Sequence, residues 1–164
     1  MSSKRRSYEA GHTPKFLVVV DDTPECDRAI YYASRRCVRI GAKVLMCRVI
    51  QTQDRNQQWL GVADIMRQEA HDEARTVLAQ AAARARSIGG IVPEQVIREG
   101  EVGQQVLALI EEDQDIVVLV LAAGTGKDGP GPLVTGLNKT AATFPIPIAI
   151  VPGQLSDQDI DALS

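Results

Sequence analysis

This 164-residue sequence lacks the marks of several common protein classes. Its longest apolar run is the eight residues from Ile116 to Ala123, whereas a membrane-spanning helix needs about 20. The three cysteines are odd in number and have no CxxC spacing, which argues against a disulfide framework and against a zinc site. The net charge of −3 provides no general attraction to nucleic acid or to anionic lipid. We therefore expect a protein that binds neither nucleic acid nor membranes.

The two ends of the chain differ from its middle in composition. Residues 1–14 contain basic side chains but no apolar segment of the kind that a secretory signal requires, which predicts a cytoplasmic location. We expect residues 1–14 to form a flexible N-terminal tail and residues 153–164 to form a mobile, acidic C-terminal tail. Between them, 15–152 is long and apolar enough for one folded domain.

Short apolar runs alternate with segments of helical spacing along this domain. The runs predict strands over 15–20, 44–50, 91–98, 116–122 and 146–151. Apolar residues spaced by three and four predict helices over 24–40, over a long stretch ending before Gly89, and over 103–112. This alternation is typical of an α/β protein with a doubly wound parallel sheet of five strands and helices on both faces.

The start of the first helix is marked by three consecutive residues. Thr23 stands where an N-cap is expected, Pro24 at the first helical position, and Glu25 in the first turn, where acidic side chains are favoured. The sequence therefore predicts a helix that begins directly after the first strand and its two acidic residues, Asp21 and Asp22.

Two segments have the placement of a ligand site, because an open doubly wound sheet binds ligands beyond the carboxyl ends of its strands, where the winding reverses. Asp21 and Asp22 end the first strand, and the glycine-rich segment 123–136 follows the fourth. Glycines let backbone N–H groups approach an anion, and a helix starting near Gly136 would direct its positive end to the same place. This composition is typical of a phosphate-binding loop.

The same residues resemble those of the universal stress protein family. Its nucleotide-binding members carry, after the fourth strand, Gly, two residues, Gly, nine residues, Gly, and Ser or Thr. Here nine residues separate Gly126 from Gly136, and the first strand ends in Asp21, as in the family. Ala123 stands at the first glycine and Leu137 at the hydroxyl position. The resemblance covers 15–152 and implies a Rossmann-like fold of the adenine-nucleotide alpha-hydrolase type, with strand order 3-2-1-4-5.

The resemblance also implies a role for individual residues. Asp21 would meet the adenosine part of a nucleotide, Val44 would line the adenine pocket, and Gly126 and Gly136 would offer backbone donors to the phosphates. Neighbouring candidate positions are Ala122, Ala123, Gly124, Leu137, Asn138 and Lys139. The implied ligand is ATP or a related adenine nucleotide, with or without Mg²⁺.

The two altered motif positions predict a degenerate site. A hydrogen bond to a charged acceptor contributes roughly 1.5–3 kcal/mol, so the lost hydroxyl at Leu137 predicts weaker nucleotide binding. No Ser-His-Asp or Cys-His set can be assembled, so we expect no enzyme beyond, at most, weak ATP hydrolysis. The resemblance further implies a homodimer formed through the last strand, Ile146 to Val151, because an apolar edge strand needs a partner. The implied function is a stress-response sensor or signalling dimer.

Two other functions compete with this interpretation. One is an interaction module of the same family that forms dimers, binds no nucleotide and has a protein partner. The other is a phospho-acceptor receiver domain, in which Asp21 and Asp22 would hold Mg²⁺ and Asp64 would be the acceptor. The segment before Asp64 makes a poor strand, however, and the Lys-Pro pair of a receiver is missing.

Two side chains receive a structural interpretation. Cys26 lies in the first turn of the first helix, where the helix dipole can lower a thiol pKa, but it has no resolving thiol nearby in sequence. His71 has no second metal ligand four residues on, which favours a partly exposed structural role.

Overall fold

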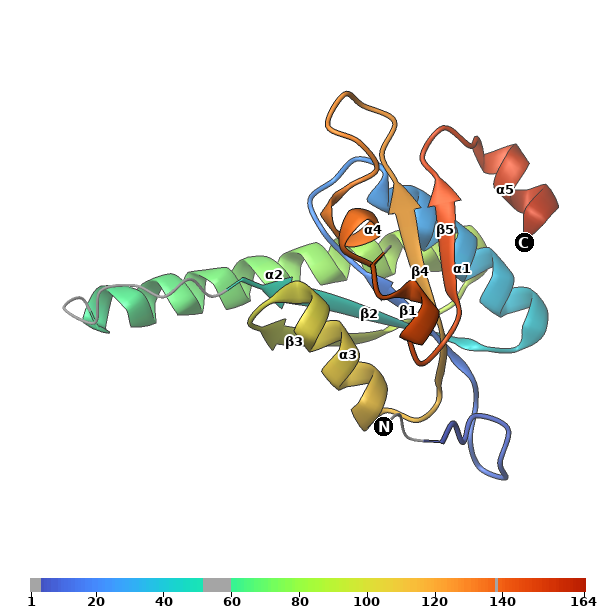
Figure 1. The fold of residues 1–164 in the computed structure, drawn as a ribbon, viewed down its shortest axis with the longest axis horizontal. Helices are drawn as coiled ribbons and strands as arrows, with labels where there is room; N and C mark the ends of the chain where they lie inside the picture. Colours follow the sequence, from blue (N-terminus) through green and yellow to red (C-terminus); the bar gives the residue numbers. More distant parts are fainter. Residues whose placement is uncertain (1–3, 52–59, 138) are drawn as a thin grey trace.

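The computed structural model describes the backbone of residues 4–51, 60–137 and 139–164. Five parallel strands form one sheet in the order β3-β2-β1-β4-β5 (Figure 1). Their bounds are β1 (Lys15–Val19), β2 (Lys43–Ile50), β3 (Glu94–Glu99), β4 (Ile116–Ala123) and β5 (Ile148–Pro152). The predicted fold class and strand order are thereby confirmed.

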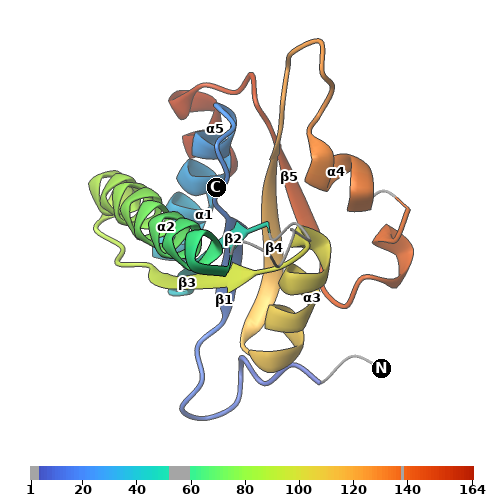
Figure 2. The same ribbon diagram turned by 90° about the vertical axis from the view of Figure 1, so that its left-hand side faces the viewer.

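Helices cover both faces of the sheet. They are α1 (Cys26–Ile40), α2 (Leu60–Gly89), α3 (Val102–Glu112), α4 (Pro132–Leu137) and α5 (Asp157–Leu163), with a 3₁₀ turn at Ala141–Thr143. Figure 2 shows α1, α2 and α5 on one face and α3 and α4 on the other. The long helix α2 extends past the edge of the sheet at its N-terminal end (Figure 1).

The central strand β1 contributes to two cores, one on each face. Phe16 and Val18 are buried in the cluster that contains α1 residues, whereas Leu17 and Val19 are buried in the cluster that contains α3 residues. Successive side chains of a strand point to opposite faces, so a strand covered on both sides needs an uninterrupted apolar run. This requirement explains the KFLVV sequence of β1.

The reversal of winding lies between β1 and β4. The chain passes from β1 through α1 to β2 and through α2 to β3 on one side, then crosses to β4 on the other side of β1. The carboxyl ends of β1 and β4 therefore diverge into loops at the same end of the sheet, where such folds bind their ligands.

The start of α1 differs from the predicted one. Thr23 is not at the N-cap position, and its N–H and its hydroxyl both donate to Asp21 Oδ1. The helix begins at Cys26, with Glu25 at the N-cap position and no side-chain cap bond. The Thr23 hydroxyl thus holds the carboxylate that ends the first strand.

The C-terminal residues are not the mobile tail expected from their composition. They form α5, whose Ile160 is fully buried against α1 residues in the core. Ser156 and Asp159 form a capping box at its start, and the Tyr31 hydroxyl donates to Asp161 Oδ1 at 2.9 Å. The acidic residues of α5 thus face solvent on one side of the helix and bind it to α1 on the other.

The N-terminal segment is docked as well. The Arg6 N–H donates to the Gln114 carbonyl at 3.0 Å, and His12 Nδ1 lies 2.7 Å from Asp115 Oδ1. Ser7 is buried. These contacts place residues 4–14 at the amino ends of the strands, away from the switch point. No helix within the described parts of the chain is long and apolar enough to cross a membrane.

Candidate functional site

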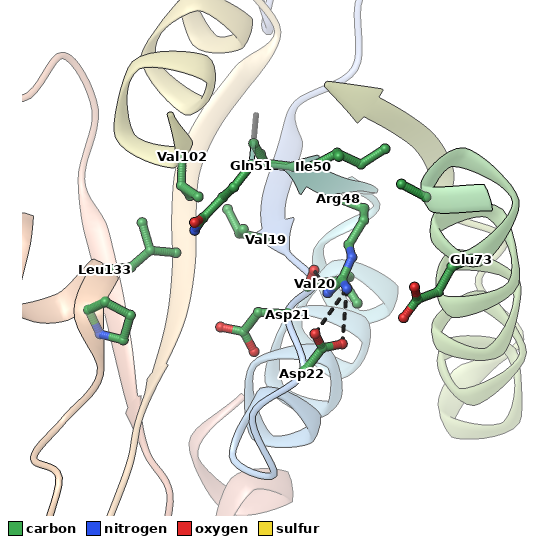
Figure 3. Close-up of a pocket in the computed structure, with 13 residues that line it drawn as sticks. Val19, Val20, Asp21, Asp22, Arg48, Ile50, Gln51, Glu73, Val102 and Leu133 are labelled. Carbon is green, nitrogen blue, oxygen red and sulfur yellow. Dashed lines mark hydrogen bonds and ion pairs between the residues drawn. The ribbon is translucent and has the colours of Figure 1, made fainter. Parts of the chain in front are cut away.

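A cavity of about 320 Å³ opens at the carboxyl ends of β1 and β2 (Figure 3). Small-molecule sites typically measure roughly 300–1,000 Å³. The cavity reaches from α2 on one side to α3 and α4 on the other. Its lining residues are Val19, Val20, Asp21, Asp22, Arg48, Val49, Ile50, Gln51, Ala70, Glu73, Val102, Pro132 and Leu133. The cavity adjoins the predicted location, because Asp21 follows β1 and Leu133 belongs to the helix that follows β4, although none of the lining residues is in β4 itself.

One side of the cavity is apolar. Three side chains labelled in Figure 3 form it, and each comes from a different element: Val19, Val102 and Leu133. Such walls suit a flat, apolar ring, because removing the ring from water against aliphatic carbon is favourable.

Asp21 is held in a fixed orientation at the edge of this apolar side. Its Oδ1 accepts the Thr23 N–H at 3.0 Å and also the Thr23 hydroxyl, which forms a closed turn. Its Oδ2 has no hydrogen-bond partner among the described residues. Figure 3 shows the carboxylate pointing toward the Leu133 side of the cavity, so it can accept a hydrogen bond from a ligand.

Arg48 occupies the opposite side. It extends from β2 and donates to the Val20 carbonyl at 3.2 Å and to Asp22 Oδ2 at 3.0 Å (Figure 3). Its side chain is only 14% exposed, whereas that of Asp22 is 77% exposed. Glu73 of α2 lines the cavity beside this pair. The cavity thus contains three carboxylates and one guanidinium, and that guanidinium is already paired.

The cavity residues on β2 and α2 escaped the sequence reasoning. Arg48 is the one charged residue in the apolar run from Val44 to Ile50, which was the available signal. A lone charge near the carboxyl end of a strand that is otherwise buried on both faces must reach solvent or a partner at that end. Glu73 carried no comparable signal, because it lies among many charged residues of α2.

Val44 does not line the cavity, and its predicted role is wrong. It pairs with Phe16 at the beginning of β2 and is 1% exposed in the core beside α1 residues. The cavity lies at the other end of the strand, where Val49 and Ile50 line it. The parallel direction of β2 places its first residues far from the switch point.

The glycine-rich segment after β4 folds back on itself. The Gly124 N–H donates to the Pro130 carbonyl at 3.0 Å, and the Gly129 N–H donates to the Gly126 carbonyl at 3.2 Å. These two amides are therefore engaged within the loop. In a phosphate-binding loop, such N–H groups point toward the anion.

The helix expected to start near Gly136 ends there instead. α4 runs Pro132–Leu137, so Gly136 and Leu137 lie in its last turn. Pro132 supplies the φ that suits the first helical position, and the Thr135 N–H donates to the Gly131 carbonyl. The positive end of α4 is consequently at Pro132, which has no N–H to offer.

The remaining candidates are spread over the end of β4 and its loop. Ala122 and Ala123 pair with Val151 and Pro152 of β5. Gly126, Gly136 and Lys139 are exposed, Gly124 and Leu137 are half-buried, and Asn138 lies outside the described residues. Among the described candidates, Asp21 is the one that lines the cavity.

The surroundings of the three cysteines make their thiols unreactive. All three are free and buried. Burial raises the pKa of Cys26 and of Cys47 to about 11, and that of Cys37 to about 12. For Cys26, desolvation outweighs any effect of the helix start, so the reactive interpretation is wrong.

The other titratable groups among the described residues do not form a second candidate site. His71 Nε2 lies 3.1 Å from Glu99 Oε1 on the surface of α2, in agreement with a structural role. Asp64 is exposed within α2 and does not follow a strand, so the receiver interpretation is wrong. In the part of the chain that the structure describes, no group of three or more His, Cys, Asp or Glu side chains could hold a metal ion.

The strand order and the two helix layers define a doubly wound α/β protein, with a cavity at the carboxyl ends of its strands. The sequence model of the universal stress protein family matches residues 13–152. The chain therefore belongs to the universal stress protein family. No curated protein sequence matches it significantly.

Solved structures share the fold at low sequence identity. Universal stress protein UspA from Lactobacillus plantarum superposes with a TM-score of 0.71 at 14% identity, over 84% of this chain and 97% of that chain. The universal stress protein from Archaeoglobus fulgidus in complex with dAMP gives 0.59 at 16% identity, over 84% and 96%. A family protein from Arabidopsis thaliana with AMP bound gives 0.58 at 17% identity, over 88% and 94%.

Proposed function

We propose that this protein is a stress-response sensor or signalling dimer whose switch-point cavity binds an adenine nucleotide with reduced affinity. The observation that carries the proposal is the cavity itself, with an apolar side and the fixed carboxylate of Asp21 at its edge. Relatives with this fold bind AMP and dAMP, which supports an adenine-containing ligand here.

The apolar side of the cavity and Asp21 at its edge would bind different parts of the ligand. The adenine ring would lie against Val19, Val102 and Leu133. A ribose hydroxyl would donate to Asp21 Oδ2, because the other oxygen of that carboxylate is occupied by Thr23. This arrangement binds and orients a nucleoside, and we propose no catalytic step beyond, at most, slow ATP hydrolysis.

The phosphate end of the ligand would be held weakly. Leu137 provides no hydroxyl, and the amides of Gly124 and Gly129 donate within the loop. Lys127 and Lys139 are exposed and could approach a phosphate only from solvent, where ion pairs contribute little. Reduced affinity for nucleotides follows from these three facts.

Dimerisation through β5 is the second part of the proposal. β5 is an edge strand, and its Ile150 is 44% exposed, which is unfavourable for an apolar side chain at an unpaired edge. Pairing β5 with the same strand of a second copy would cover Ile150 and satisfy the free backbone groups. Proline at 145, 147 and 152 limits the pairing to a short segment.

Calorimetric titration with AMP and with ATP, each with and without Mg²⁺, tests the binding proposal. We expect weak binding by the wild type and a loss of roughly tenfold in Asp21→Asn, which removes the charge of a hydrogen-bond acceptor. Asp64→Asn makes the same change at an exposed position of α2 outside the cavity, and it should leave binding unchanged. Absence of heat with every adenine ligand would refute the proposal.

A second candidate is an interaction module that binds no nucleotide. The closed glycine-rich loop, with the Gly124 N–H bonded to the Pro130 carbonyl, favours it. This candidate predicts that no adenine ligand binds, while the β5 dimer persists in sedimentation experiments. The same titration therefore separates the two functions.

A further inference from the structure

A glutamate side chain lies inside the glycine-rich loop. Glu25 stands in the turn before α1, and its carboxylate reaches the loop that follows β4. A Cβ added to Gly124 would lie 2.9 Å from Glu25 Oε1, and one added to Gly131 would lie 3.9 Å from the same oxygen. A Cβ on Gly153 would lie 3.2 Å from Glu25 Cβ. The missing side chain of Gly124 thus leaves the room that the Glu25 carboxylate occupies.

The Glu25 carboxylate is not neutralised in this position. Among the described residues it has no hydrogen-bond or ion-pair partner, although it is half-buried. The Gly124 N–H donates to the Pro130 carbonyl and not to the carboxylate. An uncompensated negative charge therefore lies beside the backbone that would otherwise receive an anion.

The neighbouring charges do not offset the negative charge of Glu25. In the loop, Lys127 and Asp128 are adjacent, exposed and opposite in sign. In the cavity, Asp21 and Glu73 add negative charge, while Arg48 is paired with Asp22. The loop meets the cavity at Pro132, so a phosphate group that extends from the cavity toward Gly131 approaches the Glu25 carboxylate. Coulomb repulsion in a partly buried site is weakly screened, so each added phosphate charge is penalised.

We infer that Glu25 excludes phosphate groups from the glycine-rich loop, so that the cavity selects an adenine nucleoside over the nucleotides. This inference rests on the proposed function, because it names the class of adenine ligand that the same cavity takes. It makes Glu25 a specificity residue that the family motif does not include. The order of affinity is adenosine first, then AMP, then ATP, because the charge of the ligand increases in that order.

Substitution of Glu25 tests the exclusion directly. Glu25→Gln keeps the shape of the side chain and removes its charge, whereas Glu25→Asp keeps the charge on a shorter side chain. Calorimetry in magnesium-free buffer should show that Glu25→Gln binds AMP roughly tenfold more tightly than the wild type does, with adenosine binding unchanged. Glu25→Asp should retain the wild-type order of affinity.

Controls separate this inference from the proposed function. Glu69→Gln removes a charge from an exposed position of α2 and should change neither affinity, and thermal melting checks that each variant is folded. If adenosine binds but the ratio of AMP to adenosine affinity is the same in Glu25→Gln and wild type, the inference is overturned and the proposed function stands. If neither adenosine nor AMP binds any variant, both are overturned.

Discussion

Docking of the C-terminal helix makes a quantitative prediction for stability. Ile160 is the buried residue of α5 and is 0% exposed in the core beside α1 residues. Replacing a fully buried Ile with Ala typically costs about 2–5 kcal/mol, through lost burial and the cavity that remains. Because α5 has seven residues, it can undock as a unit, which limits the loss. We therefore expect Ile160→Ala to lower the free energy of unfolding by about 2–3 kcal/mol.

Urea unfolding followed by circular dichroism measures this change, and the same helix offers a matched control. Leu163 lies on α5 but is 65% exposed, so Leu163→Ala should change the free energy of unfolding by less than about 0.5 kcal/mol. A value for Ile160→Ala within about 0.5 kcal/mol of the wild type would refute the docked helix, because only a mobile tail tolerates that deletion.

Three further predictions concern the core and its charges. Ser34 Oγ is buried without a hydrogen-bond partner among the described residues, so Ser34→Ala should stabilise the protein by about 1 kcal/mol in the same assay; destabilisation would show that the hydroxyl is satisfied. The native protein should react slowly with a thiol reagent at pH 8 and release all three thiols only in denaturant, because burial raises the pKa of each cysteine; rapid labelling of Cys26 in the folded protein would contradict this. Hydrogen bonds from Arg84 and then Arg28 lower the pKa of Asp27, so its stabilising contribution is present above the unfolded pKa and is lost as the pH falls through the folded one. Asp27→Asn should flatten the acid side of a stability profile, and an unchanged profile would argue against these bonds.

The fold could be predicted because its central strands are buried on both faces. An apolar run as short as Ile116 to Ala123 is typical of a strand buried on both faces, and the alternation of such runs with helical spacing leaves few topologies. The residues at which helices begin were harder to predict. Thr23 has the residue type of an N-cap, yet its hydroxyl donates to Asp21, and the sequence alone does not show which of these two hydrogen bonds a threonine will make.

The location of the site could be predicted from the sequence, but most of the residues that line it could not. Its location followed from the reversal of winding, and Asp21 from its position at the end of β1. Val44 could have been excluded, because the first residues of a parallel strand lie away from the switch point. The partners of Arg48 and the place of Glu25 depend on contacts between segments far apart in sequence, which no local pattern encodes.

The C-terminal helix had a signal that its acidic composition concealed. Ser156 followed three residues later by Asp159 is the spacing of a capping box, and Leu155 and Ile160 provide the apolar surface that docks. Net polarity of a short segment therefore says less about docking than the position of one apolar residue.

A crystal structure grown with adenosine, and a second with AMP, tests the central claim most directly. The account predicts adenosine in the switch-point cavity, with its ring against Val19 and Leu133 and its ribose within hydrogen-bonding distance of Asp21 Oδ2. It predicts that AMP occupies the cavity poorly while Glu25 remains in the loop. A cavity that stays empty at saturating adenosine, or a ligand bound elsewhere on the surface, would contradict it.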